Sequence, residues 1–123
     1  MIMEAVPVDP RLAFVYVPVP TIDAVLPFYR DTLGFTEAWR EGETTVALQV
    51  PGTDVQLMLD APGEKAGPVL ILDSLHAYIA QLGDAGDGIQ PVEIPGGYWA
   101  VMEDPAGNRV YLMDQSTDPA PAG

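Results

Sequence analysis

Carboxylates are the side chains of this chain best suited to bind a metal ion, because it has 18 acidic residues, one histidine and no cysteine. The lack of cysteine excludes disulfides, zinc–thiolate sites, iron–sulfur clusters and thiol catalysis. Asp54, Asp60 and Glu103 are the acidic residues that could hold Mg²⁺ or Mn²⁺. Asp54 and Asp60, however, fall at opposite ends of one expected strand, and Glu103 is expected to pair with Arg109. The sequence therefore does not favour a carboxylate metal site.

The elements that must position these residues occur twice in the same order. "VQLMLD" (55–60) and "VYLMDQ" (110–115) both begin Val-x-Leu-Met. β-forming runs bounded by glycine and proline predict strands at 11–17, 35–40, 44–50 and 54–60, and again at 68–72, 89–94, 98–104 and 108–114. Thr21 and Ser74 are expected to cap the two helices, which end at Gly34 and near Gly83 or Gly86. Pro27 is expected to kink the first helix.

We therefore expect an α+β fold of two βαβββ modules, 11–60 and 68–115. A linker, 61–67, joins them, with an N-terminal arm at 1–10 and a C-terminal tail at 116–123. The repeated order at a constant offset is the main evidence for this organisation, since a four-residue match alone is weak.

Composition limits the possible partners. The net charge of −13 leaves no basic footprint for nucleic acid. No apolar run is long enough to span a membrane, and the N-terminus lacks the pattern of a signal peptide, so we expect a cytoplasmic protein. The acidic excess could serve solubility alone or could attract cationic ligands, and both interpretations stay open.

The last hairpin fixes which side chains share a face of the sheet. In "EDPAGNR", Pro105 and Gly107 suit a three-residue loop between Asp104 and Asn108. This loop makes three cross-strand pairs on one face: Glu103 with Arg109, Val101 with Tyr111, and Trp99 with Met113. The other face is apolar and suits packing on a helix. Each expected strand likewise has one apolar face and one face of aromatic and polar residues.

The mixed faces supply the candidate ligand-binding residues: Phe14, Tyr16, Trp39, Gln56, Met58, Trp99, Glu103, Arg109, Tyr111 and Met113. Tyr98 is a further candidate at a strand end. Such a set, mostly apolar with a few orienting polar groups, is typical of a ligand pocket, although rings that simply fill the space are the alternative. His76 is expected in the second helix, at the surface and on the opposite side of the sheet.

"FVYVPVPTIDAVLPFYRDTLGF", the repeat and "MEDPAGNRVYLMD" together resemble the vicinal oxygen chelate superfamily, the group of glyoxalase I, extradiol dioxygenases and fosfomycin- and bleomycin-resistance proteins. The resemblance covers roughly residues 11–115. It implies two βαβββ modules that form a curled mixed sheet around a cleft, with helices on the outer face. It also implies a homodimer, across whose interface the cleft is completed.

The resemblance further implies where a divalent metal would be bound in the enzymes of the group. The four ligand positions fall on Phe14, Gln56, Pro68 (or Val69, if the alignment slips) and Tyr111. Phenylalanine and proline offer no ligand atom, and a catalytic ion needs about three strong protein ligands. We therefore expect no metal and no cofactor.

The expected function is accordingly metal-independent binding of a small molecule, planar or cationic and antibiotic-like, by sequestration, as in the bleomycin-resistance branch. Phe14, Trp99 and Tyr111 would stack on the ligand, while Gln56 and Glu103 would orient it. The alternatives are a lyase, isomerase or dioxygenase-type enzyme, either metal-free with Glu103 or Tyr111 carrying a proton or with unusual metal ligands, and a scaffold with a filled cleft. We lean towards a protein that is not an enzyme.

Overall fold

The computed structural model describes residues 10–116. The expected arm and tail, 1–10 and 116–123, lie almost wholly outside these residues. The described chain divides into two compact units. One is Leu12–Val69, and the other contains the residues from Leu70 onwards together with Arg11. Each unit is described by itself below.

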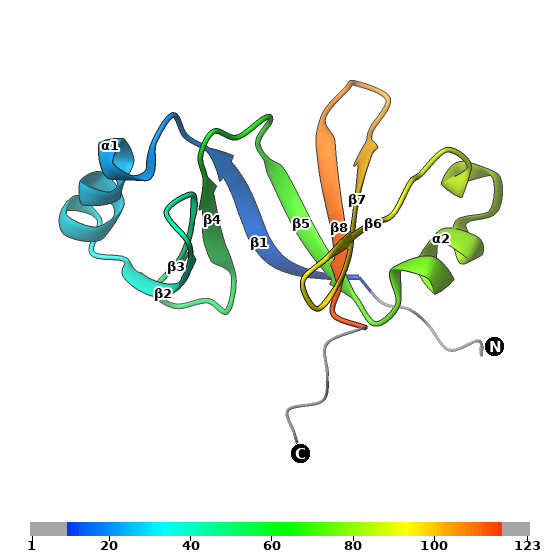
Figure 1. Cartoon of the computed structure of the whole chain (residues 1–123), viewed down its shortest axis with the longest axis horizontal. Coiled ribbons are helices and arrows are strands. Elements are labelled where there is room, and N and C mark those ends of the chain that lie inside the picture. The colour runs from blue at the N-terminus through cyan, green and yellow to red at the C-terminus, as the bar shows by residue number, and fades with distance from the viewer. Residues whose placement is uncertain (1–9, 117–123) are drawn as a thin grey trace, which may run out of the picture. The chain divides into compact units, whose positions relative to one another are not determined.

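The first unit has the expected βαβββ order (Figure 1). Its elements are β1 (Arg11–Pro18), α1 (Ile22–Pro27), the π-helical segment η1 (Phe28–Thr32), β2 (Thr36–Glu41), β3 (Thr45–Gln49) and β4 (Gln56–Asp60). The hydrogen-bonded order is β2-β3-β4-β1. β1 runs parallel to β4, and the other neighbours are antiparallel. A parallel pair requires a crossover between its strands, and here α1, β2 and β3 lie between them in the sequence.

Both ends of the first helix follow the sequence signals. Thr21 Oγ1 accepts a hydrogen bond from the backbone N–H of Ala24 at 3.2 Å, as a helix cap requires. The helix changes from α to π after Pro27, where the Leu33 N–H donates to the Phe28 carbonyl at 3.0 Å. Gly34 then has a φ of 79°, a conformation that favours glycine and ends the helix. The expected disturbance at Pro27 is thus a change of helix type.

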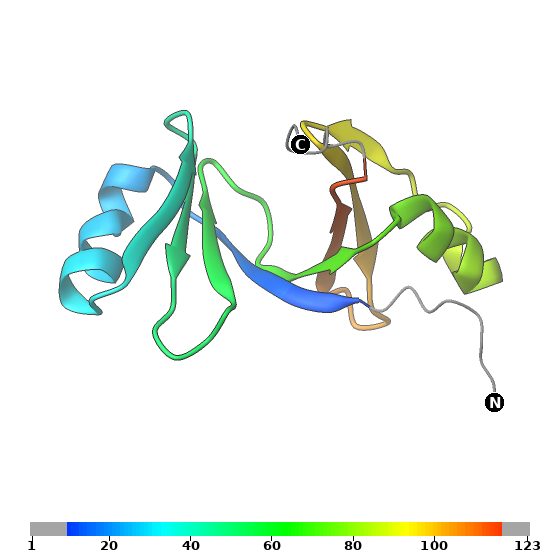
Figure 2. The same cartoon turned by 90° about the horizontal axis from the view of Figure 1, so that it is seen from below.

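One face of the first sheet packs on α1, which lies along it (Figure 2). Alternate residues of β3 and β4 are fully buried there, among them Val46, Leu48 and Leu59. They form a core with Ile22 and Leu26 of α1. Because side chains alternate along a strand, this packing leaves Gln56 and Met58 on the opposite face.

The second unit repeats the order. Its elements are β5 (Gly67–Leu72), of which only the part from Leu70 belongs to this unit, α2 (Leu75–Leu82), the 3-10 helix η2 (Gly83–Gly86), β6 (Val92–Ile94), β7 (Gly97–Glu103) and β8 (Arg109–Asp114). The strand order is β5-β8-β7-β6. β6 is shorter than the expected strand at 89–94. Ile89 packs instead against the core beneath α2, and Pro91 has no N–H to donate to a sheet.

A fully buried carboxylate joins three elements of this unit. Asp114 is 0% exposed and accepts hydrogen bonds from the backbone N–H groups of Leu75, at the start of α2, and Tyr98, in β7. Ser116 donates to it through both N–H and hydroxyl. Gly97 lies so close that an added Cβ would be 1.9 Å from the Asp114 carbonyl oxygen. Asp114 is therefore a structural residue, which the sequence analysis did not identify.

The α+β class and the two βαβββ modules are confirmed, with the helix of each module on one face of its strands. Among residues 10–116, no helix combines the length and the apolar character that crossing a bilayer demands.

Candidate functional site

Five predicted site residues share the face of the first sheet that α1 does not cover. We call Phe14, Tyr16, Trp39, Gln56 and Met58 the first aromatic face. In the β1–β4 register, Phe14 lies beside Gln56 and Tyr16 beside Met58. The rings of Phe14 and Trp39 meet edge to face, with centroids 5.9 Å apart.

These residues differ in accessibility. Trp39 is 37% exposed, whereas Tyr16 and Met58 are 8% exposed. Phe14 and Gln56 are half-buried. The surface that this face offers to a ligand therefore consists mainly of Trp39, Phe14 and Gln56, whereas Tyr16 and Met58 contribute little exposed area.

A chain of hydrogen bonds crosses this face from β2 to the β3–β4 turn. The indole N–H of Trp39 donates to Gln56 Oε1 at 3.1 Å, and Gln56 Nε2 donates to Gln49 Oε1 at 3.2 Å. Gln49 Nε2 then donates to the Thr53 carbonyl at 2.8 Å. Gln49 was not among the predicted site residues, although the alternation of strand 44–50 places it on the same face as Gln56.

Asp60 is held by two hydroxyl groups on the same face. The Tyr16 hydroxyl donates to Asp60 Oδ2 at 2.5 Å, and the Thr45 hydroxyl donates to Oδ1 at 2.7 Å. Both carboxylate oxygens thus have a hydrogen-bond partner within the sheet. No group of three or more His, Asp or Glu side chains placed to hold a metal ion occurs within the described part of the chain.

The second unit holds the other five predicted residues on one face of β7 and β8. We call Trp99, Glu103, Arg109, Tyr111 and Met113 the second aromatic face. The predicted register is confirmed: Trp99 pairs with Met113, and Glu103 pairs with Arg109. The Trp99 and Tyr111 rings have centroids 5.2 Å apart and an interplanar angle of 33°.

The polar residues of this face form an ion pair. Arg109 Nε lies 3.3 Å from Glu103 Oε2, as the sequence predicted. Glu103 is the more accessible partner, with a side chain 51% exposed, and Trp99 is half-buried. Tyr111 and Met113 are buried. That the two aromatic faces line a single cleft stays a prediction.

Tyr98 does not join the second aromatic face, and its expected contribution was wrong. It precedes Trp99 in β7, so strand alternation turns it to the helix side, where it packs in the α2 core. Its ring meets the His76 ring at a centroid distance of 4.5 Å. His76 is exposed on α2, on that same helix side of the sheet, as the sequence predicted.

The four residues at which the resemblance predicts metal ligands do not form a donor set for a catalytic divalent ion. Phe14 presents ring carbons, and Pro68 has no donor atom in its side chain. The amide oxygen of Gln56 is neutral and already accepts a hydrogen bond from Trp39. Tyr111 would have to lose a proton whose ordinary pKa is about 10. A divalent ion that needs about three strong ligands does not fit these residues.

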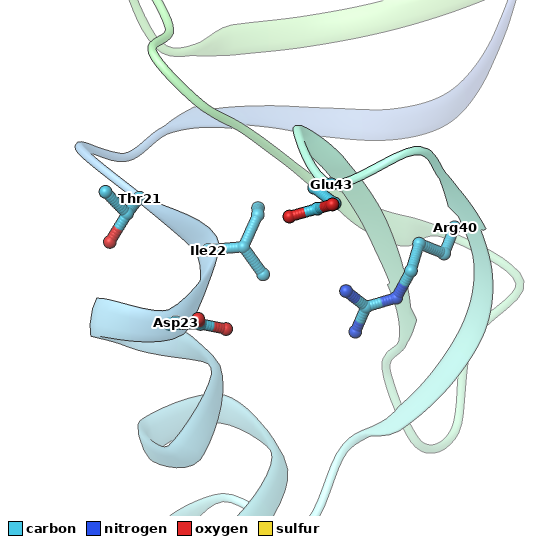
Figure 3. A pocket seen from close by; sticks show the side chains of 5 residues that line it. All are labelled: Thr21, Ile22, Asp23, Arg40 and Glu43. Atoms are coloured by element: carbon cyan, nitrogen blue, oxygen red, sulfur yellow. The ribbon is translucent and has the colours of Figure 1, made fainter.

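A separate pocket lies on the helix side of the first unit, between the start of α1 and the β2–β3 hairpin. It measures about 300 Å³ and is lined by Thr21, Ile22, Asp23, Arg40 and Glu43. The side chains of Arg40 and Glu43 point toward those of Ile22 and Asp23 (Figure 3). Arg40 Nε and Nη2 each lie 3.0 Å from a carboxylate oxygen of Glu37. These hydrogen bonds raise the pKa of Arg40 and lower the pKa of Glu37. No pattern in the sequence predicted this pocket, and no predicted site residue lines it.

Comparison with known proteins identifies the family. No curated protein matches the sequence. Solved structures of similar fold include a glyoxalase/bleomycin resistance protein/dioxygenase superfamily member from Vibrio splendidus 12B01, at 15% identity and a TM-score of 0.64, covering 86% of this chain and 98% of that one. A protein described as an NAD-dependent benzaldehyde dehydrogenase from Legionella pneumophila has 18% identity and a TM-score of 0.69, with coverages of 83% and 97%. Methylmalonyl-CoA epimerase from Mycobacterium tuberculosis has 20% identity and a TM-score of 0.63, with coverages of 98% and 95%. The sequence model of the Glyoxalase/Bleomycin resistance protein/Dioxygenase superfamily matches residues 11–112, and the chain belongs to this superfamily.

Proposed function

We propose that the chain is a metal-independent small-molecule binding protein that acts by sequestration of a planar or cationic, antibiotic-like ligand. The observation that carries the proposal is that Phe14, Gln56, Pro68 and Tyr111 stand at the positions where the resemblance predicts the family's metal ligands. Two of these, Phe14 and Gln56, lie side by side in the first aromatic face. Where relatives hold an ion, this chain holds a ring beside an amide.

The accessible rings support binding by stacking. Trp39 and Phe14 in the first aromatic face, and Trp99 in the second, retain exposed surface. Flat aromatic ligands stack on such rings, and indole faces attract cations. The net charge of −13 raises the local concentration of a cationic ligand. In the proposal, Phe14 and Trp99 stack on the ligand rings, and Gln56 and Glu103 orient the polar groups of the ligand. Tyr111, expected to stack as well, is only 3% exposed and instead supports the Trp99 ring.

The proposal includes a cytoplasmic homodimer in which the cleft is completed across the interface. Sequestration without turnover removes one ligand molecule for each binding site. The number of binding sites in the assembly therefore limits how much ligand the protein captures. An assembly of two chains would offer two equivalent sites. Analytical ultracentrifugation at several protein concentrations tests this part, and a monomer at all concentrations contradicts it.

Acid–base catalysis without a metal is the second candidate function. Its favourable observation is the Glu103 carboxylate, which is half-exposed on the same face as Trp99. A carboxylate in that position could accept a proton from a bound ligand. Steady turnover of a substrate by metal-stripped protein would favour this candidate over sequestration.

Isothermal titration calorimetry against a panel of glycopeptide and planar aromatic antibiotics tests the proposed function. We expect saturable binding of at least one compound, with the compound recovered unchanged afterwards. Failure of the whole panel to bind contradicts the proposal. Conversion of the bound compound into a product supports the enzymatic candidate instead.

A further inference from the structure

We infer that Gln49 fixes the orientation of the Gln56 amide, so that the site selects planar ligands with an adjacent hydrogen-bond acceptor and donor, such as cyclic lactams. This inference rests on the proposed function and narrows its ligand class. It comes from the hydrogen-bond chain Trp39–Gln56–Gln49–Thr53, which lies entirely within the first unit.

The two ends of this chain permit only one direction of donation. An indole nitrogen can donate a hydrogen bond but cannot accept one, so the group of Gln56 facing Trp39 must be its oxygen. At the other end, the Thr53 carbonyl can only accept, so the group of Gln49 facing it must be its nitrogen. In the hydrogen bond between the two residues, Gln56 therefore donates through its nitrogen and Gln49 accepts through its oxygen.

The end at Thr53 is itself held in place. The Thr53 N–H donates to the Val50 carbonyl at 3.3 Å, and the Thr53 hydroxyl accepts from the Val55 N–H at 3.0 Å. These bonds fix the β3–β4 turn, and with it the carbonyl that orients Gln49. A flip of Gln56 would place its NH₂ against the Trp39 N–H and its oxygen against the Gln49 oxygen, which would lose two hydrogen bonds.

One acceptor site and one donor remain on Gln56. A primary amide has two lone pairs on oxygen and two N–H groups. Among the described residues, one lone pair is taken by Trp39 and one N–H by Gln49. A ligand that satisfies both remaining groups must itself carry a donor and an acceptor. Side by side on one edge, these form the pattern by which glutamine recognises the edge of adenine.

The neighbouring rings place a flat ligand beside this amide. Gln56 is half-buried and adjacent to Phe14 in the register, and Trp39 donates to it directly. A ligand stacked on Phe14 or Trp39 can therefore present its edge to Gln56. A cyclic lactam offers a carbonyl acceptor and an N–H donor side by side in one rigid plane, whereas a simple hydrocarbon offers only the plane.

Three probes of nearly equal size test the ligand class: isoquinolin-1(2H)-one, its N-methyl derivative and naphthalene. We expect the lactam to bind about tenfold more tightly than the N-methyl derivative, since methylation removes the donor and one hydrogen bond. If no probe binds although an antibiotic of the panel does, the lactam ligand class is overturned and the proposed function is retained. If the three probes bind with equal affinity, binding by stacking is supported, but the proposed selection of lactams by Gln56 is overturned.

The variant Gln49→Leu tests the positioning role, with Gln81→Leu on the exposed face of α2 as the matched control. Gln49→Leu should reduce the preference for the lactam to about twofold or less and leave the affinity for naphthalene unchanged. It should also shift the Trp39 indole N–H resonance in a ¹H–¹⁵N spectrum, because Gln56 then loses its bond to Gln49 and only the Trp39 N–H still orients its amide. Gln81→Leu should change neither quantity.

An unchanged lactam preference and an unchanged Trp39 resonance in Gln49→Leu would overturn the positioning role. The wild-type comparison of lactam and N-methyl derivative does not depend on this variant, so the ligand class remains testable if Gln49→Leu does not fold. The assignment of the Trp39 resonance comes from Trp39→Phe, since the chain has only two tryptophans.

Discussion

The ring of Trp99 lies against the ring of Tyr111, with centroids 5.2 Å apart and planes inclined by 33°. The two residues are diagonal neighbours, because Trp99 pairs with Met113 and Tyr111 pairs with Val101. Diagonal positions across an antiparallel pair are within reach of aromatic side chains. Tyr111 is only 3% exposed, whereas Trp99 is half-buried. The indole is thus the accessible ring of the pair, supported by a buried phenol.

Trp99→Ala should weaken the binding of a planar ligand by about tenfold or more, since stacking on an aromatic side chain contributes about 1–3 kcal/mol per ring in comparable recognition of bases. Calorimetry with the tightest ligand of the antibiotic panel measures the change. Val101→Ala is the matched control, because Val101 is exposed on the same face and pairs with Tyr111. Equal affinities of Trp99→Ala and the wild-type protein for the ligand would show that Trp99 does not contribute to binding.

Tyr16→Phe should reduce the free energy of unfolding by about 1–3 kcal/mol at neutral pH, because Asp60 loses a hydrogen bond to a charged group. Urea denaturation measures this difference. Tyr29→Phe is a suitable control, since Tyr29 packs in the α1 core and the structure gives its hydroxyl no hydrogen bond among the described residues. A loss in Tyr16→Phe no larger than in Tyr29→Phe would mean that the Tyr16–Asp60 bond contributes little.

Asp114→Ala should destabilise the second unit more than removal of a helix cap. Asp114 accepts from Leu75 and Tyr98, and its loss leaves these two N–H groups without an acceptor in the interior, at about 1–3 kcal/mol each. Ser74→Ala, which removes only the N-cap of α2, should cost about 1 kcal/mol. Thermal denaturation of both variants gives the comparison, and similar losses would contradict the role of Asp114 as a three-element junction.

The backbone N–H groups of Ala106 and Asn108 donate hydrogen bonds to the Asp104 carboxylate. These bonds should persist to a lower pH than bonds to an aspartate with an ordinary pKa. Hydrogen bonds from Asn108, first from its side chain and then from its backbone, lower the pKa of Asp104. A lowered pKa in the folded state contributes stability above the unfolded value of about 3.9, and this stability is lost as the pH falls through the folded pKa.

An NMR titration of the Ala106 and Asn108 amides, which both donate to Asp104, measures the midpoint. We expect it below about 3.9 in wild type and closer to that value in Asn108→Ala. A wild-type midpoint at or above the ordinary value would show that the side-chain bond from Asn108 does not hold the ionised form.

The sequence predicted this hairpin well because the loop residues determine its register. Pro105 and Gly107 suit one short loop, and every opposing pair follows from it. Alternation then assigned both faces of β4 and β7 correctly. The prediction for Tyr98 failed because it grouped the residue with Trp99 by chemistry, although the two are sequence neighbours in one strand and must face opposite sides.

The face of the sheet on which Trp39 lies does not follow from strand alternation alone. Thr36 pairs with Gln49 and Trp39 pairs with Ala47, with an irregularity between Glu37 and Trp39. Strict alternation from Thr36 would turn Trp39 to the helix side. The bulge brings it instead to the face of Gln56 and turns Arg40 to the other side, toward the pocket near α1. The hydrogen-bond partners of Gln49 and Asp60 depend on such tertiary details, which no short pattern in the sequence specifies.

The central claim is that this chain holds its ligand by aromatic stacking and hydrogen bonds rather than by coordination to a metal ion. Calorimetric titration of one panel ligand into metal-stripped protein, with EDTA present and then with Zn²⁺ or Mn²⁺ added, tests it most directly. The account predicts the same dissociation constant under all conditions. Binding that EDTA abolishes and a divalent ion restores would contradict it.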